Sequence, residues 1–176
     1  MLNNDNIKHF FTNRERETAW RTKQDAYKWH SWLYHHGSDA NPNCPFCNRH
    51  DADNIQHVLV NCPVTEELWR NCAQTLRSYT TKMFIIDEDL VKYNLTNIED
   101  DQMEWLLPIK MVNIVKIKLI AWRRTLTASN RVLENRSNWI ERMATEVQED
   151  LETFTEKLKD KYPNEIQEKI HLRRIT

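Results

Sequence analysis

The sequence predicts a mainly α-helical domain, and three observations support this fold class. The 176 residues include a single glycine, Gly37, so the positive-φ positions that hairpin-rich β architecture needs are scarce. Residues 103–127 are apolar on most faces of a helix, which indicates a central helix contacted from several sides. Residues 140–158 carry apolar side chains in a heptad-like pattern, which indicates a second long helix.

The composition is that of a soluble globular chain. Charged residues make up 29% and hydrophobic residues 40%, which is unlike a disordered protein. No run of eighteen apolar residues occurs, so we expect no membrane span. The N-terminus lacks the basic start and apolar core of a signal peptide. We therefore expect a nuclear or cytoplasmic protein in a reducing compartment, not a secreted one.

The N-terminal part predicts one aromatic-rich helix after a loosely held start. Residues 1–13 are Asn-rich and are expected to be a flexible N-terminus. The helical pattern runs from about Arg14 to His36 and stops near Gly37, a natural residue just past a helix end. We expect most of its aromatic side chains to pack in the core, while base stacking by one or two of them stays open. They are Trp20, Tyr27, Trp29, Trp32 and Tyr34.

Three cysteines and one histidine then follow at ligand spacing. They are Cys44, Cys47, His57 and Cys62, in the pattern C-x2-C-x9-H-x4-C. Zn²⁺ takes four N/S ligands in a tetrahedron, and a short chain commonly supplies them in this way. We predict one structural Zn²⁺. A catalytic zinc would keep an open position for water, and four protein ligands leave none.

Two other residues near this pattern could compete for the same role. His50 could replace His57, but it lies only three residues after Cys47 and stands beside Arg49, so His57 is preferred. Cys72 is the fourth cysteine, and it falls on the apolar line of the next helix. We expect it to be a buried small hydrophobic residue.

The remaining elements are helices and one ambiguous run. Asp51–Asn54 offers helix-start residues, and a short helix after them would present His57. Residues 65–77 predict another helix, and residues 83–86 a strand or a buried extended piece. In residues 87–104 we expect the acidic clusters to be solvated helix starts. The main helix of 103–127 should begin near Pro108.

A last helix is predicted from a cap at Ser137 or Asn138 to about Tyr162. Its apolar seam could dock on the domain or pair with a second copy, and the sequence leaves both open. We therefore divide the rest of the chain into two parts. Residues 14–130 form a helical domain stapled by a Cys3His zinc knuckle. A C-terminal helix and tail occupies 131–176.

Basic residues are concentrated in one part of a chain whose net charge is −1. Residues 105–142 hold eight basic and two acidic side chains, a net charge of +6, and the first helix adds further bases. Phosphate contacts would come from these regions. The predicted nucleic-acid contacts are Arg21, Lys28, Lys116, Lys118, Arg123, Arg124 and Arg131.

The residues around the metal pattern resemble a known family. Cys44-Pro-Phe-Cys47, then His57-Val-Leu-Val-Asn-Cys62-Pro63 and Leu68-Trp69, resemble the zinc-binding region after the reverse transcriptase domain of LINE-type (non-LTR) retrotransposons. The likeness is close over 44–69, looser over 16–36 and 105–126, and absent after about 130. The chain has Asp53-Asn54 where Glu-Thr is common in the family, and no Gly after Cys47. Neither change touches a ligand.

The resemblance implies a non-catalytic accessory region that binds RNA or single-stranded or target DNA. The family's polymerase carries a Y/F-x-D-D motif, whereas Asp100-Asp101 here follows Ile98-Glu99. The residues show no nucleophile–base pair and no Gly-rich phosphate loop, so we expect no enzyme in this chain. The alternative is a zinc-stabilised helical module for protein interaction, or for self-association through the last helix.

A metal assay tests the ligand assignment. We expect the purified protein to hold one zinc ion per chain, and Cys44→Ser and His57→Ala to lose it, because each removes one of four ligands. Atomic emission measured beside protein concentration gives the stoichiometry. Zinc retained in His57→Ala would transfer the assignment to His50.

Overall fold

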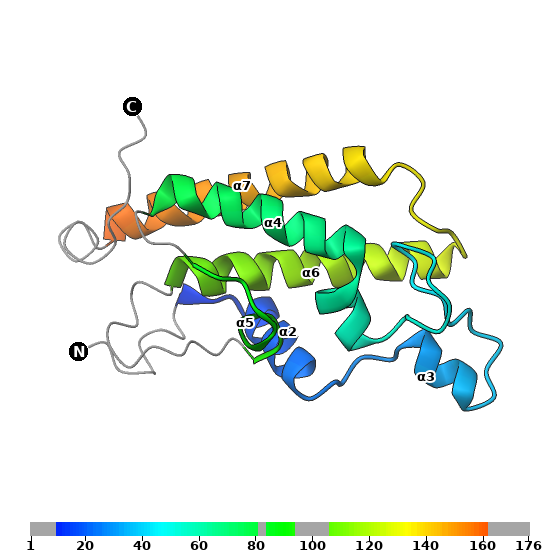
Figure 1. Cartoon of the computed structure of the whole chain (residues 1–176). Helices are drawn as coiled ribbons and strands as arrows, with labels where there is room; N and C mark the ends of the chain where they lie inside the picture. Colours follow the sequence, from blue (N-terminus) through cyan, green and yellow to red (C-terminus); the bar gives the residue numbers. More distant parts are fainter. Residues whose placement is uncertain (1–9, 81–83, 94–105, 162–176) are drawn as a thin grey trace.

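The computed structural model describes residues 10–80, 84–93 and 106–161, and within these ranges the chain forms helices and loops without strands (Figure 1). This confirms the predicted mainly α fold class. The elements in order are α2 (Asn13–Lys23), α3 (His30–His35), the π-helix η2 (His57–Asn61), α4 (Pro63–Tyr79), α5 (Glu88–Tyr93), α6 (Leu106–Ala128) and α7 (Arg136–Lys161).

Helix α6 is the centre of the fold, as the apolar pattern predicts. The helices α4 and α7 pack against each other and against α6, while α2 and α5 also contact it (Figure 1). Pro108 lies in the first turn of α6, where its missing N–H costs no helical hydrogen bond. No helix in the described part of the chain is long and apolar enough to cross a membrane.

Helix α7 packs on α4 and α6 of the same chain through its apolar seam. The six seam residues are all buried: Ile140, Met143, Val147, Leu151, Phe154 and Leu158. The start differs slightly from the expectation, because the helix begins at Arg136 and the Asn135 side chain accepts a hydrogen bond from the Asn138 backbone N–H at 3.2 Å. Asn135 is therefore the cap, and not Ser137 or Asn138.

The expected single helix over 14–36 is wrong, because the chain breaks after α2. Asp25 adopts a positive φ of 48°, and the Ala26 N–H reaches back to the Arg21 carbonyl at 2.8 Å. This is the hydrogen-bond pattern of a Schellman helix end, with aspartate where glycine is usual. The Asp25 side chain also accepts a hydrogen bond from the Trp29 indole at 2.7 Å, which holds the turn.

The other helix ends follow ordinary capping rules. Gly37 has a φ of 83° and ends α3, as predicted. Helix α2 starts with a capping box between Thr12 and Glu15. Helix α4 starts at Pro63, two residues before the predicted Thr65.

Between α4 and α6, residues 84–87 form neither helix nor strand. The Asp87 side chain accepts a hydrogen bond from the Leu90 N–H, so this acid caps α5. The predictions for residues 1–9, for the acidic cluster at 99–101 and for the tail after 161 lie outside the described residues.

Two lysines of α6 point into the protein. Lys110 pairs with the buried Glu15 of α2 at 2.7 Å. Lys116 has no exposed surface, and this burial lowers its pKa to about 7. A side chain that solvent does not reach cannot contact a phosphate. Lys116 is therefore removed from the predicted nucleic-acid contacts.

The depressed pKa of Lys116 predicts a pH-dependent stability. Between pH 7 and about 10 the unfolded chain binds a proton at Lys116 that the folded chain does not, so raising the pH stabilises the fold. Lys116→Met lacks this titrating group, so its stability relative to wild type should fall as the pH rises, by up to about 1.4 kcal/mol per unit.

Urea unfolding of both proteins over this pH range measures the difference. Lys92→Met is the control, since Lys92 forms a surface pair with Glu88. A difference between Lys116→Met and wild type that stays constant with pH would contradict the assigned shift.

Candidate metal centre

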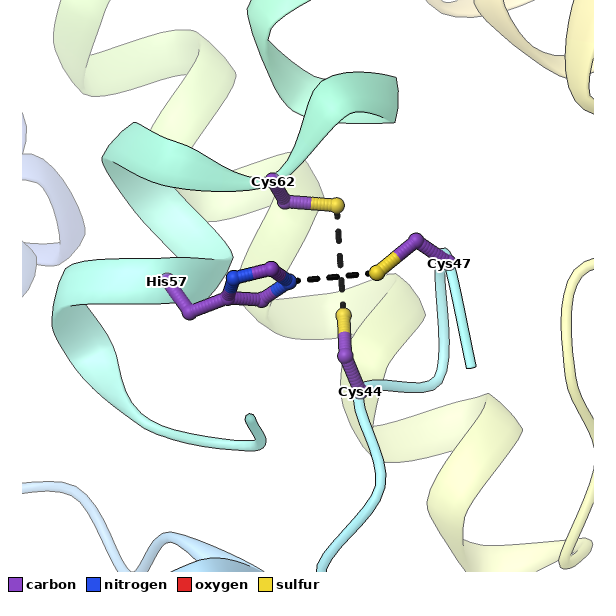
Figure 2. Close-up of side chains that lie close together, drawn as sticks. All are labelled: Cys44, Cys47, His57 and Cys62. Atoms are coloured by element: carbon purple, nitrogen blue, oxygen red, sulfur yellow. Dashed lines mark hydrogen bonds between the residues drawn. The ribbon is translucent and has the colours of Figure 1, made fainter. Parts of the chain in front are cut away.

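Three thiols and one imidazole point toward one another in the structure (Figure 2). The ligand atoms of Cys44, Cys47, His57 and Cys62 all lie within 4.8 Å of one another. The sulfurs of Cys44 and Cys62 are 3.9 Å apart, and no disulfide joins any of these cysteines. In a tetrahedral site with Zn–S bonds of about 2.3 Å, neighbouring sulfurs are about 3.8 Å apart. The sulfur pair therefore sits at ligand spacing.

A tight turn places the first two sulfurs. The Asn48 N–H donates to the Cys44 carbonyl at 2.8 Å, and the Cys44 N–H donates to the Arg49 carbonyl at 3.0 Å. Asn48 has a φ of 62°, a conformation that asparagine tolerates better than most residues. The backbone N–H groups of Phe46 and Cys47 point at the Cys44 sulfur, where they stabilise a thiolate.

The π-helix η2 places the other two ligands. The Asn54 side chain accepts a hydrogen bond from the His57 N–H at 2.9 Å and so starts the turn. The Cys62 N–H then donates to the His57 carbonyl at 2.7 Å. The wider turn of a π-helix brings His57 and Cys62 to the same side, with the imidazole Nε2 3.1 Å from the Cys47 sulfur.

The electrostatics of the cluster favour a bound cation. The hydrogen bond from the Cys44 thiol lowers the pKa of Cys62 to about 5, helped by the backbone N–H groups of Thr65 and Val64 at the start of α4. That same hydrogen bond, with burial, raises the pKa of Cys44. Three thiolates this close would repel one another, and a divalent cation removes that repulsion. Three sulfurs and one imidazole form a donor set that zinc binds readily.

The comparison with known families agrees with this geometry. The family model described as zinc-binding in reverse transcriptase matches residues 3–69. The match confirms the resemblance to a reverse-transcriptase zinc-binding region that the residues suggest. No curated protein and no solved structure matches the chain. The LINE-type origin and the weaker likeness over 105–126 stay predictions.

The family match and the geometry of the four side chains together support one structural Zn²⁺. The four side chains of the cluster supply the four ligands of a closed tetrahedral site, which leaves no position for a reacting water. Holding the metal would fix the loop after α3 to the start of α4. The matched family is an accessory zinc region and not a catalytic one.

The structure distinguishes the two histidines that compete as ligand. His57 is buried within the cluster, whereas the His50 ring is exposed and its Nδ1 lies 3.2 Å from the Asn43 side-chain oxygen. Cys72 is fully buried on α4, as predicted, and burial raises its pKa to about 12.

Two residues that anchor the zinc-binding region are missed by the sequence reasoning. Phe46, inside the Cys44–Cys47 turn, is fully buried and packs 5.3 Å from the Trp139 ring of α7. Asp53 is fully buried and forms an ion pair with Arg123 of α6 at 2.5 Å. The Asp53 carboxylate also accepts a hydrogen bond from the His30 N–H at 2.9 Å.

Arg123 is therefore a structural residue and not a phosphate contact. Its side chain is 6% exposed, it binds both carboxylate oxygens of Asp53, and it lies 4.5 Å from the Trp29 ring centroid. It also donates to the Lys28 carbonyl at 3.1 Å. This joins the zinc-binding loop, the α2–α3 connection and α6. The periodic line Val112, Lys116, Leu119, Arg123 and Leu126 is the signal that both buried cations face the core.

The other five predicted contacts are at least partly exposed but do not form one cluster. Arg21 pairs with Glu17 at 2.7 Å, and Lys118 pairs with Glu146 and Asp150 of α7. Arg124 is exposed on α6, where it lines a hollow together with residues of α2. Lys28 and Arg131 are exposed in loops.

The Asp53–Arg123 pair predicts a large stability effect from one small substitution. Asp53→Asn leaves the Arg123 charge buried without its counter-ion, so we expect the free energy of unfolding to fall by about 3–5 kcal/mol. The control is Glu146→Gln, which weakens a half-exposed pair with Lys118 and should cost less than about 1 kcal/mol.

Urea unfolding at neutral pH, with zinc content measured in parallel, separates the two variants. Equal stabilities for Asp53→Asn and Glu146→Gln would show that the buried pair does not hold the loop to α6.

Proposed function

We propose that the chain is a non-catalytic nucleic-acid-binding region that holds RNA template or DNA target beside a reverse transcriptase. The match over residues 3–69 supports a setting beside that enzyme. The absence of a Y/F-x-D-D motif from the sequence supports a role without polymerase chemistry. The metal then organises the fold, and the binding surface lies elsewhere.

One surface feature carries this proposal. Two adjoining hollows lie along α6: a larger recess beside α2 and α7, and a smaller notch beside α2. They share Arg14, Ile117 and Ala121. Seven basic residues line them against three acidic ones, Glu15, Glu17 and Asp150. The basic residues are Arg14, Arg21, Lys110, Lys118, Arg124, Lys157 and Lys161.

Part of this positive charge is not neutralised locally. Lys110, Lys118 and Arg21 have acidic partners. Arg14, Arg124 and Lys157 form no ion pair with another described residue, and all three are exposed. In a chain of net charge −1, an uncompensated basic groove favours a polyanion as its ligand.

Charge reversal in the groove tests the proposal. The double variant Arg14→Glu and Arg124→Glu should bind single-stranded RNA and DNA about tenfold or more weakly, with a shallower salt dependence. Each lost phosphate contact lowers the slope of log affinity against log salt by about 0.7. Fluorescence anisotropy between about 50 and 200 mM salt measures both.

The matched control is Arg70→Glu with Arg77→Glu, which reverses the same charge on the exposed face of α4. Zinc content confirms that each variant is folded. If wild type binds neither polymer at low salt, nucleic-acid binding is not the function. If both double variants lose the same affinity, the groove is not the site.

A protein-interaction role is the second candidate. Trp20 is 60% exposed, Trp32 is 55% exposed and Ile85 is 77% exposed, and large exposed aromatic side chains are common in protein interfaces. Self-association through the α7 seam is not favoured, because α4 and α6 cover that seam within the chain. A protein partner would therefore dock on α2 and α3.

A further inference from the structure

The larger of the two hollows has the size and lining of a ligand site. Its volume of about 580 Å³ falls within the roughly 300–1,000 Å³ typical of small-molecule pockets. Its floor is apolar, with Ile114 and Ile117 from α6 and Phe154 and Leu158 from α7. Contacts to phosphate need charged or polar side chains and not an apolar lining, because phosphate oxygens are charged hydrogen-bond acceptors.

The smaller hollow has a different chemistry. Its volume is about 190 Å³, and Arg14, Arg21 and Arg124 line it together with Thr18 and Tyr27. Guanidinium groups match the oxygens of phosphate in a two-pronged geometry. Arg21 forms an ion pair with Glu17, so Arg14 and Arg124 are the two arginines left to bind an anion. The lining of this notch is therefore suited to a phosphate group.

The two hollows meet at Arg14, Ile117 and Ala121. The recess, which combines apolar side chains of α6 and α7 with several lysines and acids, thus adjoins an arginine-lined notch. A nucleotide combines a flat base, whose faces are apolar and whose edges are polar, with a charged phosphate, and a sugar joins the two. The juxtaposition fits one nucleotide unit whose base enters the recess while its phosphate lies at the notch.

We propose that this recess takes an unpaired base of single-stranded nucleic acid, with the adjoining phosphate held by Arg14 and Arg124. The inference rests on the proposed function and adds to it the substrate class. In a duplex the bases are stacked and paired, so a base could enter the recess only at the cost of unstacking and unpairing it. The site therefore selects a single strand over a duplex by base insertion, without reading its sequence.

Filling the recess without changing its charge tests the inference. Ala121 is half-buried where the two hollows meet, so Ala121→Trp places an indole in the space for the base. Thr153→Trp fills the recess from the exposed face of α7, in case the first variant does not fold. Ala128→Trp, at the exposed end of α6, is the control.

Two probes separate base from backbone: a single-stranded oligouridylate and an abasic strand of the same length and charge. We expect wild type to bind the oligouridylate at least about fivefold more tightly than the abasic strand. Ala121→Trp and Thr153→Trp should each remove that preference, while Ala128→Trp keeps it. A duplex of the same sequence should bind like the abasic strand or more weakly.

The outcomes distinguish the inference from the function on which it rests. If wild type binds both strands equally and the filling variants change nothing, base insertion is wrong and nucleic-acid binding stands. If the filling variants weaken the binding of both strands equally, the recess holds the sugar–phosphate backbone of the strand and not a base. If wild type binds neither strand but binds an acidic peptide that Ala121→Trp excludes, both proposals are wrong.

Discussion

The buried ion pair between Asp53 and Arg123 is the contact on which the rest of the structure depends. Asp53 lies between the metal-binding cysteines, and Arg123 lies near the end of the central helix α6. Their charges are almost entirely removed from water, so neither charged side chain is stable there without the other. The same carboxylate holds the start of α3, and the same guanidinium covers Trp29. One pair thus fixes three segments that are far apart in the sequence.

The metal centre and the helical bundle support each other through these contacts. Within the Cys44–Cys47 turn, the buried Phe46 packs on Trp139 of α7. The Pro45 carbonyl accepts a hydrogen bond from the Leu133 N–H in the loop before α7, and the Cys47 carbonyl accepts one from the side chain of Arg136, the first residue of α7. Metal ligation would fix the loop internally, and the ion pair and the aromatic contact fix it to the bundle.

Periodicity and spacing predicted the parts of this protein that follow from local rules. The apolar patterns located α4, α6 and α7, and the ligand spacing located the four residues that meet in Figure 2. The break after α2 could not be predicted, because Asp25 adopts a left-handed conformation without a glycine or proline to mark it. The count of basic residues was correct, but a count does not say which face of a helix a charge occupies. Lys116 and Arg123 lie on the core face, and only the helical line through them carries that information.

The segment that the family model recognises ends at Trp69, and the folding unit does not. The partners of its buried groups come much later in the chain: Arg123 for Asp53, Trp139 for Phe46 and Lys110 for Glu15. A fragment cut at the family boundary would keep every metal ligand and still expose an uncompensated aspartate and an unpacked phenylalanine. The boundary read from sequence similarity and the boundary of cooperative folding are thus different for this protein. Helices α6 and α7 supply the surface against which the metal-binding segment packs.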